Sequence, residues 1–317
     1  MDNSKRIYFA IAIGLISLAC ATIPSSMTAQ PNYAEWTAPA NLGPVINSGV
    51  VDTGPAISKN GLSLYFASGR SGGAGGLDIW VSQRATVDDP WGRPTNLQVV
   101  NTASTENIPA FSRDGHWMFF NSNRPGSLGD VDIWASWRAQ THDDFGWQTP
   151  VNLGMNVNTM FGDSGVSYFE NEEGGAPLIF FSSNRPVNGV PTGGVYVSAQ
   201  LPDGSFGPST LVPELSGAES MRPMIRFDGL EIFLFSNRMG TLGARDIWTS
   251  VRDSISDPWS TPANLGPVVN TTANEITEYL SADGRELYFS SDRSGGFGLT
   301  DLYVTTRIKG HGAKDRD

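Results

Sequence analysis

The stretch "SNRPGSLGDVDIW" (residues 122–134) joins a Ser-x-Arg phrase, a glycine-rich loop and an Asp-Ile-Trp phrase. The chain repeats it as "SGRSGGAGGLDIW" (68–80), "SNRMGTLGARDIW" (236–248) and "SDRSGGFGLTDLY" (291–303). A weaker copy is "SNRPVNGVPTGGVYV" (183–197). Five copies in one chain indicate a repeat architecture in which each copy marks one structural unit.

A second phrase precedes each glycine loop and fixes the period. Its copies are "WTAPANLGPVIN" (36–47), "WGRPTNLQVVN" (91–101), "WQTPVNLGMNVN" (147–158) and "WSTPANLGPVVN" (259–270), with a degraded copy "FGPSTLVPEL" (206–215). The first residues of the copies, which are Trp36, Trp91, Trp147, Phe206 and Trp259, lie 55, 56, 59 and 53 residues apart. The repeated region therefore spans residues 35–307.

Each unit contains four short segments that favour β-strands. In the second unit these are 107–115, which ends in an Asp-Gly turn, 116–123, 132–138 and 147–154. The last segment holds a proline, which an edge strand tolerates. Four antiparallel strands repeated five times predict an all-β fold, a five-bladed β-propeller.

The phase of the repeat predicts how the ring closes. The repeated region begins with a fourth-strand phrase at 36–47 and ends with a third strand at 301–307, so the last blade is one strand short. Pairing the N-terminal phrase with the last blade completes that blade and leaves neither edge open.

The units resemble the WD-like repeats of TolB-type propellers, with their pattern S-x-DG-x-x-L-x-F-x-S-x-R followed by D-I-[WY]. The resemblance covers residues 35–307 and implies a β-propeller. It implies a broad choice of functions, because that family includes periplasmic interaction proteins and peptidase propellers. TolB-type proteins usually carry six blades and another domain, whereas this chain has five units.

Composition and charge narrow the class of partner. The 317 residues carry a formal net charge of −11, which argues against nucleic acid and against anionic lipid. We expect a glycan, a peptide or an envelope protein as partner and a monomeric propeller. Cys20 is the single cysteine, so the folded region has no disulfide and no cysteine-based metal site.

The N-terminus predicts export, with two alternatives for processing. Residues 1–21 combine basic residues with an apolar run too short for a comfortable membrane span, as in a signal peptide. Cleavage at Ala19-Cys20-Ala21 would release the protein into the periplasm or the medium, whereas a lipid on Cys20 would make it a lipoprotein. Residues 22–34 are predicted as a flexible leader and 308–317 as a polar tail.

Two charged series recur once per blade. The arginines of the Ser-x-Arg phrase are Arg70, Arg124, Arg185, Arg238 and Arg293. The acids ahead of the first strand, aligned on the turn that follows, are Asp52, Glu106, Asp163, Glu219 and Glu275. Five carboxylates near one channel mouth repel each other, so either the arginines or a cation such as calcium must neutralise them. We expect the arginines to do so in a structural ring, with no metal site and no other cofactor.

A third series opens the third strand of four blades. Its members are Asp78, Asp132, Asp246 and Asp301, and Gly194 replaces the acid in the third blade. We expect these acids to stabilise the turn of the blade. Because Arg185 persists beside Gly194, the entry acid Asp163 is the expected partner of that arginine.

Residues that break the repeat are the candidates for a site. Ligand-binding candidates at the channel mouth are Arg222, Glu278, Phe161, Tyr168 and Met221. We expect a non-catalytic protein that recognises a glycan, peptide or protein at its channel face. The alternative is a carboxylate-based glycoside hydrolase, since five-bladed propellers include arabinanase-type enzymes; its catalytic candidates are Glu275, Glu278, Glu219 and Asp163. A purely structural propeller is the third hypothesis.

Overall fold

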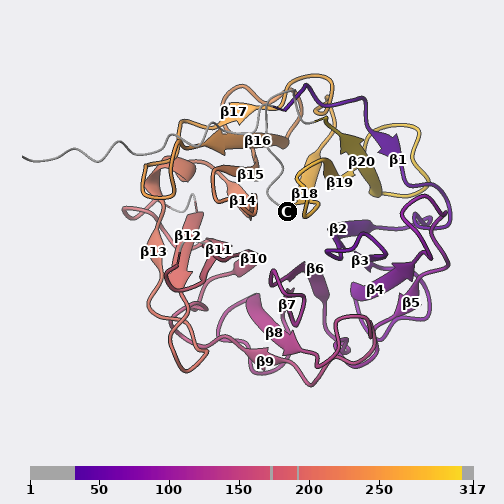
Figure 1. Cartoon of the computed structure of the whole chain (residues 1–317), viewed down its shortest axis with the longest axis horizontal. Helices are drawn as coiled ribbons and strands as arrows, with labels where there is room; N and C mark the ends of the chain where they lie inside the picture. The colour runs from indigo at the N-terminus through magenta and orange to yellow at the C-terminus, as the bar shows by residue number, and fades with distance from the viewer. Residues whose placement is uncertain (1–32, 172–173, 191–192, 309–317) are drawn as a thin grey trace, which may run out of the picture.

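The computed structural model describes residues 33–171, 174–190 and 193–308. It contains five four-stranded antiparallel sheets arranged around a central channel, which confirms the five-bladed propeller (Figure 1). The predicted signal peptide (1–21), most of the leader (22–34) and all but one residue of the tail (308–317) lie outside the described residues.

The strands of each blade run from the channel outward in chain order. Blade one holds β2 (Asp52–Ile57), β3 (Ser63–Ser68), β4 (Asp78–Gln83) and β5 (Thr95–Asn96). Blade two holds β6 (Glu106–Phe111), β7 (Trp117–Ser122), β8 (Asp132–Trp137) and β9 (Val151–Asn152). Blade three holds β10 (Asp163–Phe169), β11 (Leu178–Ser183), β12 (Gly194–Ala199) and β13 (Thr210–Leu211).

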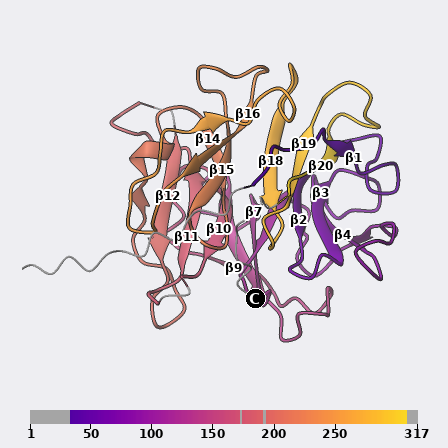
Figure 2. The ribbon, with the colours of Figure 1, turned by 45° about the horizontal axis from the view of Figure 1, so that its top comes forward.

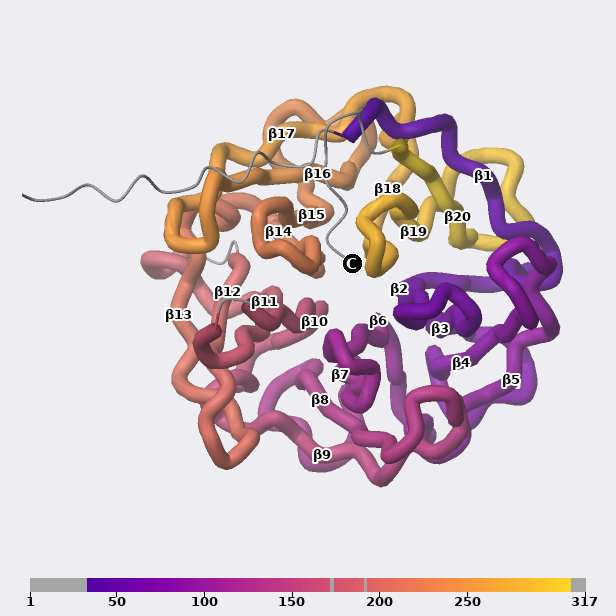
Figure 3. The backbone as a smooth tube through the Cα atoms, in the orientation of Figure 1, coloured from indigo at the N-terminus to yellow at the C-terminus, as the bar shows by residue number. Residues whose placement is uncertain are grey.

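The last two blades complete the ring. Blade four holds β14 (Ser220–Ile225), β15 (Glu231–Ser236), β16 (Asp246–Val251) and β17 (Ala263–Asn264), and the short 3₁₀-helix η1 (Pro213–Leu215) precedes it. Blade five holds β18 (Glu275–Leu280), β19 (Glu286–Ser291), β20 (Asp301–Thr306) and the N-terminal β1 (Ala40–Asn41). The pairing of Ala40 with Val304 confirms the predicted closure, and Figure 3 shows the indigo and yellow segments side by side there.

The two faces of the ring carry different connections. The glycine loops and the loops that enter each blade lie on one face, which we call the glycine-loop face; Gly76, for example, donates its N–H to the carbonyl of Ser104 in the next entry loop. The turns that join the first and second strands lie at the other end of the innermost strands, on the hairpin face. Figure 2 shows the ring tilted so that this depth is visible.

Every innermost strand bulges at the same point. The register with the second strand shifts by one residue in each blade, for example between Thr53 and Ala56. The residue in the bulge has a positive φ in all five blades: Gly54, Ile108, Gly165, Arg222 and Thr277. Glycine is required in blade three, because a Cβ on Gly165 would lie 2.7 Å from the Cα of Arg222. The bulges therefore bring the channel walls of neighbouring blades into close contact.

Apolar side chains fill the space between the blades. The second strands supply fully buried residues such as Phe66, Phe120, Phe181 and Phe289. This alternation of small and aromatic residues along short strands is what the repeat encodes.

Candidate functional site

The repeated stretch folds into one structural module per blade. In blade two, Ser122 Oγ accepts hydrogen bonds from the backbone N–H and Nε of Arg124, at 3.1 and 3.0 Å. The guanidinium then lies 5.0 Å from the ring of Trp134 and donates to the carbonyl of Val100. The aromatic partners in the five blades are Trp80, Trp134, Tyr196, Trp248 and Tyr303. Ser-x-Arg and Asp-Ile-Trp recur together because the arginine of one packs on the aromatic ring of the other.

The entry acids of four blades pair with these arginines. The ion pairs are Arg70–Asp52 at 2.6 Å, Arg124–Glu106 at 3.1 Å, Arg185–Asp163 at 2.8 Å and Arg293–Glu275 at 2.9 Å. All four acids are fully buried. Each also accepts hydrogen bonds from the entry loop, as Asp163 does from the backbone and hydroxyl of Thr159. These ion pairs and hydrogen bonds enclose and stabilise the four carboxylates, so that a substrate would not reach them.

Blade four departs from the series by one residue. Ser220 occupies the position of the acid, and Arg238 donates to its hydroxyl at 2.7 Å. Glu219 lies outside the ring and pairs with the half-exposed Arg245 at 2.9 Å. The sequence alignment on the following turn placed Glu219 one residue out of register, because the strand start and not the turn sets the position of the acid.

The difference between blades gives a direct test of the ion pairs. Replacing Arg124 with leucine leaves Glu106 as an unpaired buried charge, so we expect a loss of about 3 kcal/mol in the free energy of unfolding. Replacing Arg238 with leucine leaves no acid of the described residues without its ion-pair partner. We therefore expect a loss of only about 1 kcal/mol in the free energy of unfolding. Equilibrium urea unfolding of both variants measures the difference, and equal losses would contradict the assigned pairing.

The acids that open the third strands stabilise the glycine loops. Asp132 accepts from the backbone N–H groups of Leu128 and Gly129, at 2.8 and 3.2 Å, and from Asn152 at 2.7 Å. Asp78, Asp246 and Asp301 make the same contacts in their blades. In blade three the side chain of Ser216 lies against Gly194 instead.

Arg222 spans the central channel at the level of the bulges. From blade four, its Nη1 donates to the carbonyl of Thr277 at 2.5 Å and its Nη2 to the carbonyl of Pro55 at 2.6 Å. A longer contact of 3.4 Å reaches Pro109, and the backbone N–H of Arg222 donates to Ser182 Oγ at 2.7 Å. The side chain, only 2% exposed, therefore connects blade four to blades one, two and five and satisfies carbonyls on the free edges of innermost strands, while its backbone N–H adds blade three.

Glu278 lies in the bulge of blade five, where three other blades have proline. It is fully buried, and neither of its carboxyl oxygens has a hydrogen-bond partner among the described residues. Burial raises the pKa of Glu278 to about 8, while the charge of Arg222 opposes the rise. Burial likewise lowers the pKa of Arg222 to about 10. Glu278 is thus a largely neutral acid in the sealed centre of the ring.

A cavity of about 880 Å³ opens on the hairpin face, and all five blades line it. The wall of the cavity toward the centre of the ring consists of residues near the ends of the innermost strands, including Phe111, Met224 and Tyr279. Tyr279 lies 6.0 Å from the guanidinium carbon of Arg222, so the crossing arginine lies behind this wall. A concave, partly apolar site with a few polar groups is the usual form of a small-ligand site.

Two acids, Glu170 and Asp114, line this cavity together with Tyr168. Burial raises the pKa of the Tyr168 hydroxyl well above its usual range, and the charges of Glu170 and then Asp114 raise it further. The hydroxyl donates to Gln200 Oε1 at 3.1 Å. Asp114 Oδ1 accepts from Ser112 and from the backbone of His116, at 2.5 and 3.0 Å. Glu170, Asp114 and Tyr168 all line the cavity.

The structure separates the ligand-binding candidates that the sequence grouped together. Tyr168 lines the cavity on the hairpin face, whereas Phe161 lies in the entry loop on the glycine-loop face, where its carbonyl contacts Gly129. Arg222 and Glu278 are enclosed between the faces, and Met221 lies half-buried beside Arg222. The catalytic candidates Glu275, Asp163, Glu219 and Glu278 do not meet at one open site.

A second repeated arginine was missed in the sequence. Arg84, Arg138, Arg252 and Arg307 follow the third strands, and each packs on a tryptophan of the second phrase, at 4.2–4.5 Å from the ring. The signal was present as an arginine directly after the third strand of four blades, with Gln200 at that position in blade three. In blade two this arginine joins a buried network in which Asp144 accepts from Tyr65 and Arg138, at 2.6 and 3.0 Å.

Metal ligands and membrane spans were also sought. Across residues 33–308, apart from the four that the structure leaves out, no three histidine, cysteine or acidic side chains gather as a metal would require. In that same part of the chain, no helix combines the length and apolar character needed to cross a membrane.

Comparison with known proteins gives matches among solved structures alone. No family model and no curated protein matches this chain. The catalytic domain of an α-L-arabinofuranosidase from Coprinopsis cinerea matches with 14% identity and a TM-score of 0.57, over 90% of this chain and 100% of that one. An endo-arabinase from Bacteroides thetaiotaomicron matches with 16% identity and a TM-score of 0.55, over 89% and 100%. A putative TolB from Agrobacterium tumefaciens matches with 15% identity over 87% and 91%, but its TM-score of 0.46 is too low to support an argument.

These matches share the fold with this chain, and they correct one expectation. We expected a non-catalytic recognition protein, with a glycoside hydrolase as the alternative. Structures that match over most of the chain with TM-scores above 0.5 include an arabinofuranosidase and an arabinase, so the non-catalytic interpretation is wrong on this comparison. The expectation counted the regular repeats against a hydrolase, whereas a propeller fold does not by itself determine activity.

Proposed function

We propose that this protein is a glycoside hydrolase whose site is the cavity on the hairpin face. The observation that supports it best is that two acids, Glu170 and Asp114, line this cavity together with Tyr168. Glycosidases use a pair of carboxyl groups, one as acid and the other as base or nucleophile. The fold shared with an α-L-arabinofuranosidase and an endo-arabinase supports the same proposal.

The proposal gives the two carboxyl groups different roles. Glu170 is the less exposed of the two and lies beside Tyr168, so we assign it the proton donor. Asp114 is exposed at the cavity mouth, where water enters, and its Oδ2 is the oxygen left to act on that water. In the overall reaction the glycosidic C–O bond breaks. The oxygen of water bonds to the anomeric carbon as Asp114 accepts one of its protons, and a proton from Glu170 goes to the leaving oxygen; exchange with solvent then returns the proton from Asp114 to Glu170.

The remaining lining suits a sugar ring. Phe111, Tyr168, Tyr279 and Phe227 present aromatic surface, against which the C–H faces of a sugar pack. Lys59, which no described residue contacts through a hydrogen bond or ion pair, adds a donor at the rim, where it is exposed. Apolar surface with a few donors and acceptors binds a neutral polar ligand in one orientation.

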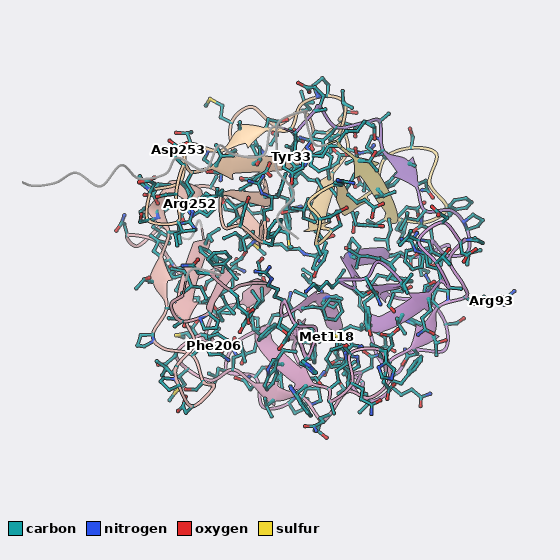
Figure 4. All side chains as sticks on the ribbon, viewed as in Figure 1. Tyr33, Arg93, Met118, Phe206, Arg252 and Asp253 are labelled. Carbon is teal, nitrogen blue, oxygen red and sulfur yellow. The ribbon has the colours of Figure 1, made fainter. Side chains whose placement is uncertain are left out.

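The test is hydrolysis of arabinose- and xylose-containing oligosaccharides by the parent and by Glu170→Gln. Removal of a general acid is expected to lower kcat/KM by about 10²–10⁴-fold. Asp253→Asn is the matched control, since Asp253 is exposed on the periphery of the ring (Figure 4) and does not line the cavity; we expect parental activity. A parent inactive on every glycoside, or full activity in Glu170→Gln, would contradict the proposal.

We further propose export of the enzyme through the N-terminal signal, to the periplasm or the medium, with a lipid at Cys20 as the alternative. The repeated phrases support a kinship of the blades with WD-like repeats of the TolB type. Mass spectrometry of the mature protein distinguishes cleavage after Ala21 from lipidation of Cys20.

A further inference from the structure

The cavity has one entrance, because the channel behind it is closed. Arg222 crosses the channel at the bulges, with hydrogen bonds to carbonyls of blades one, two and five, and Glu278 lies fully buried at the same level. The lining residues of the innermost strands, such as Ile57, Phe111 and Leu280, all follow the bulges in the sequence. A ligand in the cavity therefore cannot pass through to the glycine-loop face.

The mouth of the cavity is also bridged. The guanidinium carbon of Arg113, from blade two, lies 5.8 Å from the ring centroid of Phe227, from blade four. Blade three lies between these two blades in the ring (Figure 1), so this contact joins blades that are not neighbours. Both residues line the cavity, and Phe227 is 38% exposed. A long polymer lying across the mouth would collide with this bridge.

We propose that the cavity binds the free end of a saccharide chain, so that the enzyme removes terminal sugars from oligosaccharides and does not cut within polymers. This inference rests on the proposed glycoside hydrolase function. A cavity walled by all five blades and closed below admits a chain only end-on. The interior of a polymer would need an open groove with two exits. Preference for chain ends follows from this shape alone, whichever sugar is bound.

The first experiment follows products from linear arabino-oligosaccharides and from the arabinan polymer. We expect mono- or disaccharides as the first products and a nearly constant solution viscosity of the polymer. An early fall in viscosity with long fragments would overturn the inference while leaving the hydrolase function intact.

The second experiment keeps the inference testable if hydrolysis fails. The melting temperature of Glu170→Gln is measured with linear arabino- and xylo-oligosaccharides, and with the corresponding polymers at equal sugar mass. A shift with oligosaccharides that is much smaller with polymers supports end binding, since polymers offer few ends. Equal shifts, or no shift with any saccharide, would overturn it. Parent inactivity alone contradicts the hydrolase function.

A substitution in the contact between Arg113 and Phe227 tests whether this bridge limits the access of polymers to the cavity. Phe227→Ala removes the contact with Arg113, and we expect the rate on polymer relative to trisaccharide to rise about two- to fivefold, the factor that such an exposed contact supplies. Arg93→Gln, at an exposed arginine on the outer rim (Figure 4), is the control and should leave this ratio unchanged. An unchanged ratio in Phe227→Ala would remove the bridge from the account of selectivity and overturn its part in the proposal.

Discussion

Arg222→Met is expected to destabilise the propeller by about 3–5 kcal/mol. The substitution removes the donors that satisfy the carbonyls of Pro55 and Thr277 and leaves these buried oxygens unpaired. The cost is large because this one side chain joins blade four to blades one, two and five.

Equilibrium urea unfolding of the parent and of Arg222→Met measures this loss. Arg93→Met is the matched control, because Arg93 is exposed at the outer rim; we expect a change within about 0.5 kcal/mol. An Arg222→Met variant as stable as the parent would show that the crossing arginine does not hold the ring together.

Glu278→Gln is expected to stabilise the protein, increasingly so as the pH rises from about 4.5 to 8. The folded-state pKa of about 8 lies above the ordinary value of 4.5, so the folded protein holds a proton that the unfolded chain releases in this window. The parent therefore loses stability with rising pH, by about 1.4 kcal/mol per pH unit from this group. Glutamine keeps the shape of the neutral acid without the titration.

The measurement is the difference in unfolding free energy between parent and Glu278→Gln at several pH values. Other titrating groups cancel in the difference. We expect little difference near pH 4 and a gain on the order of 3–5 kcal/mol near pH 8. A difference independent of pH would mean that Glu278 is ionised in the folded protein at neutral pH.

The repeat predicted the fold because each phrase encodes a contact that every blade needs. Serine, arginine and tryptophan at fixed spacings specify the Arg124–Trp134 module, and the order of phrases specified the closure of blade five by β1. The entry acid of blade four was misplaced, since neighbouring Glu219 and Ser220 both fit the pattern and only the strand start distinguishes them.

The candidate site was harder to predict, because its location depends on which face of the ring contains the cavity. Tyr168 was singled out as a break in the repeat. Asp114, however, belongs to an Asp-Gly turn that looks structural in any sequence, and Glu170 lies where blade three departs from the repeat. Only the fold brings these two acids to the same cavity. The sequence likewise marked Glu278 and Arg222, but it could not show that the channel encloses them.

The most direct test of the cavity as a hydrolytic site is a crystal structure of Glu170→Gln soaked with an arabino- or xylo-oligosaccharide. We expect one end of the saccharide in the cavity on the hairpin face, with a glycosidic oxygen within hydrogen-bond distance of the substituted side chain and Asp114 on the side of the anomeric carbon. Saccharide bound on the glycine-loop face, with the cavity empty, would contradict the site and its chemistry together.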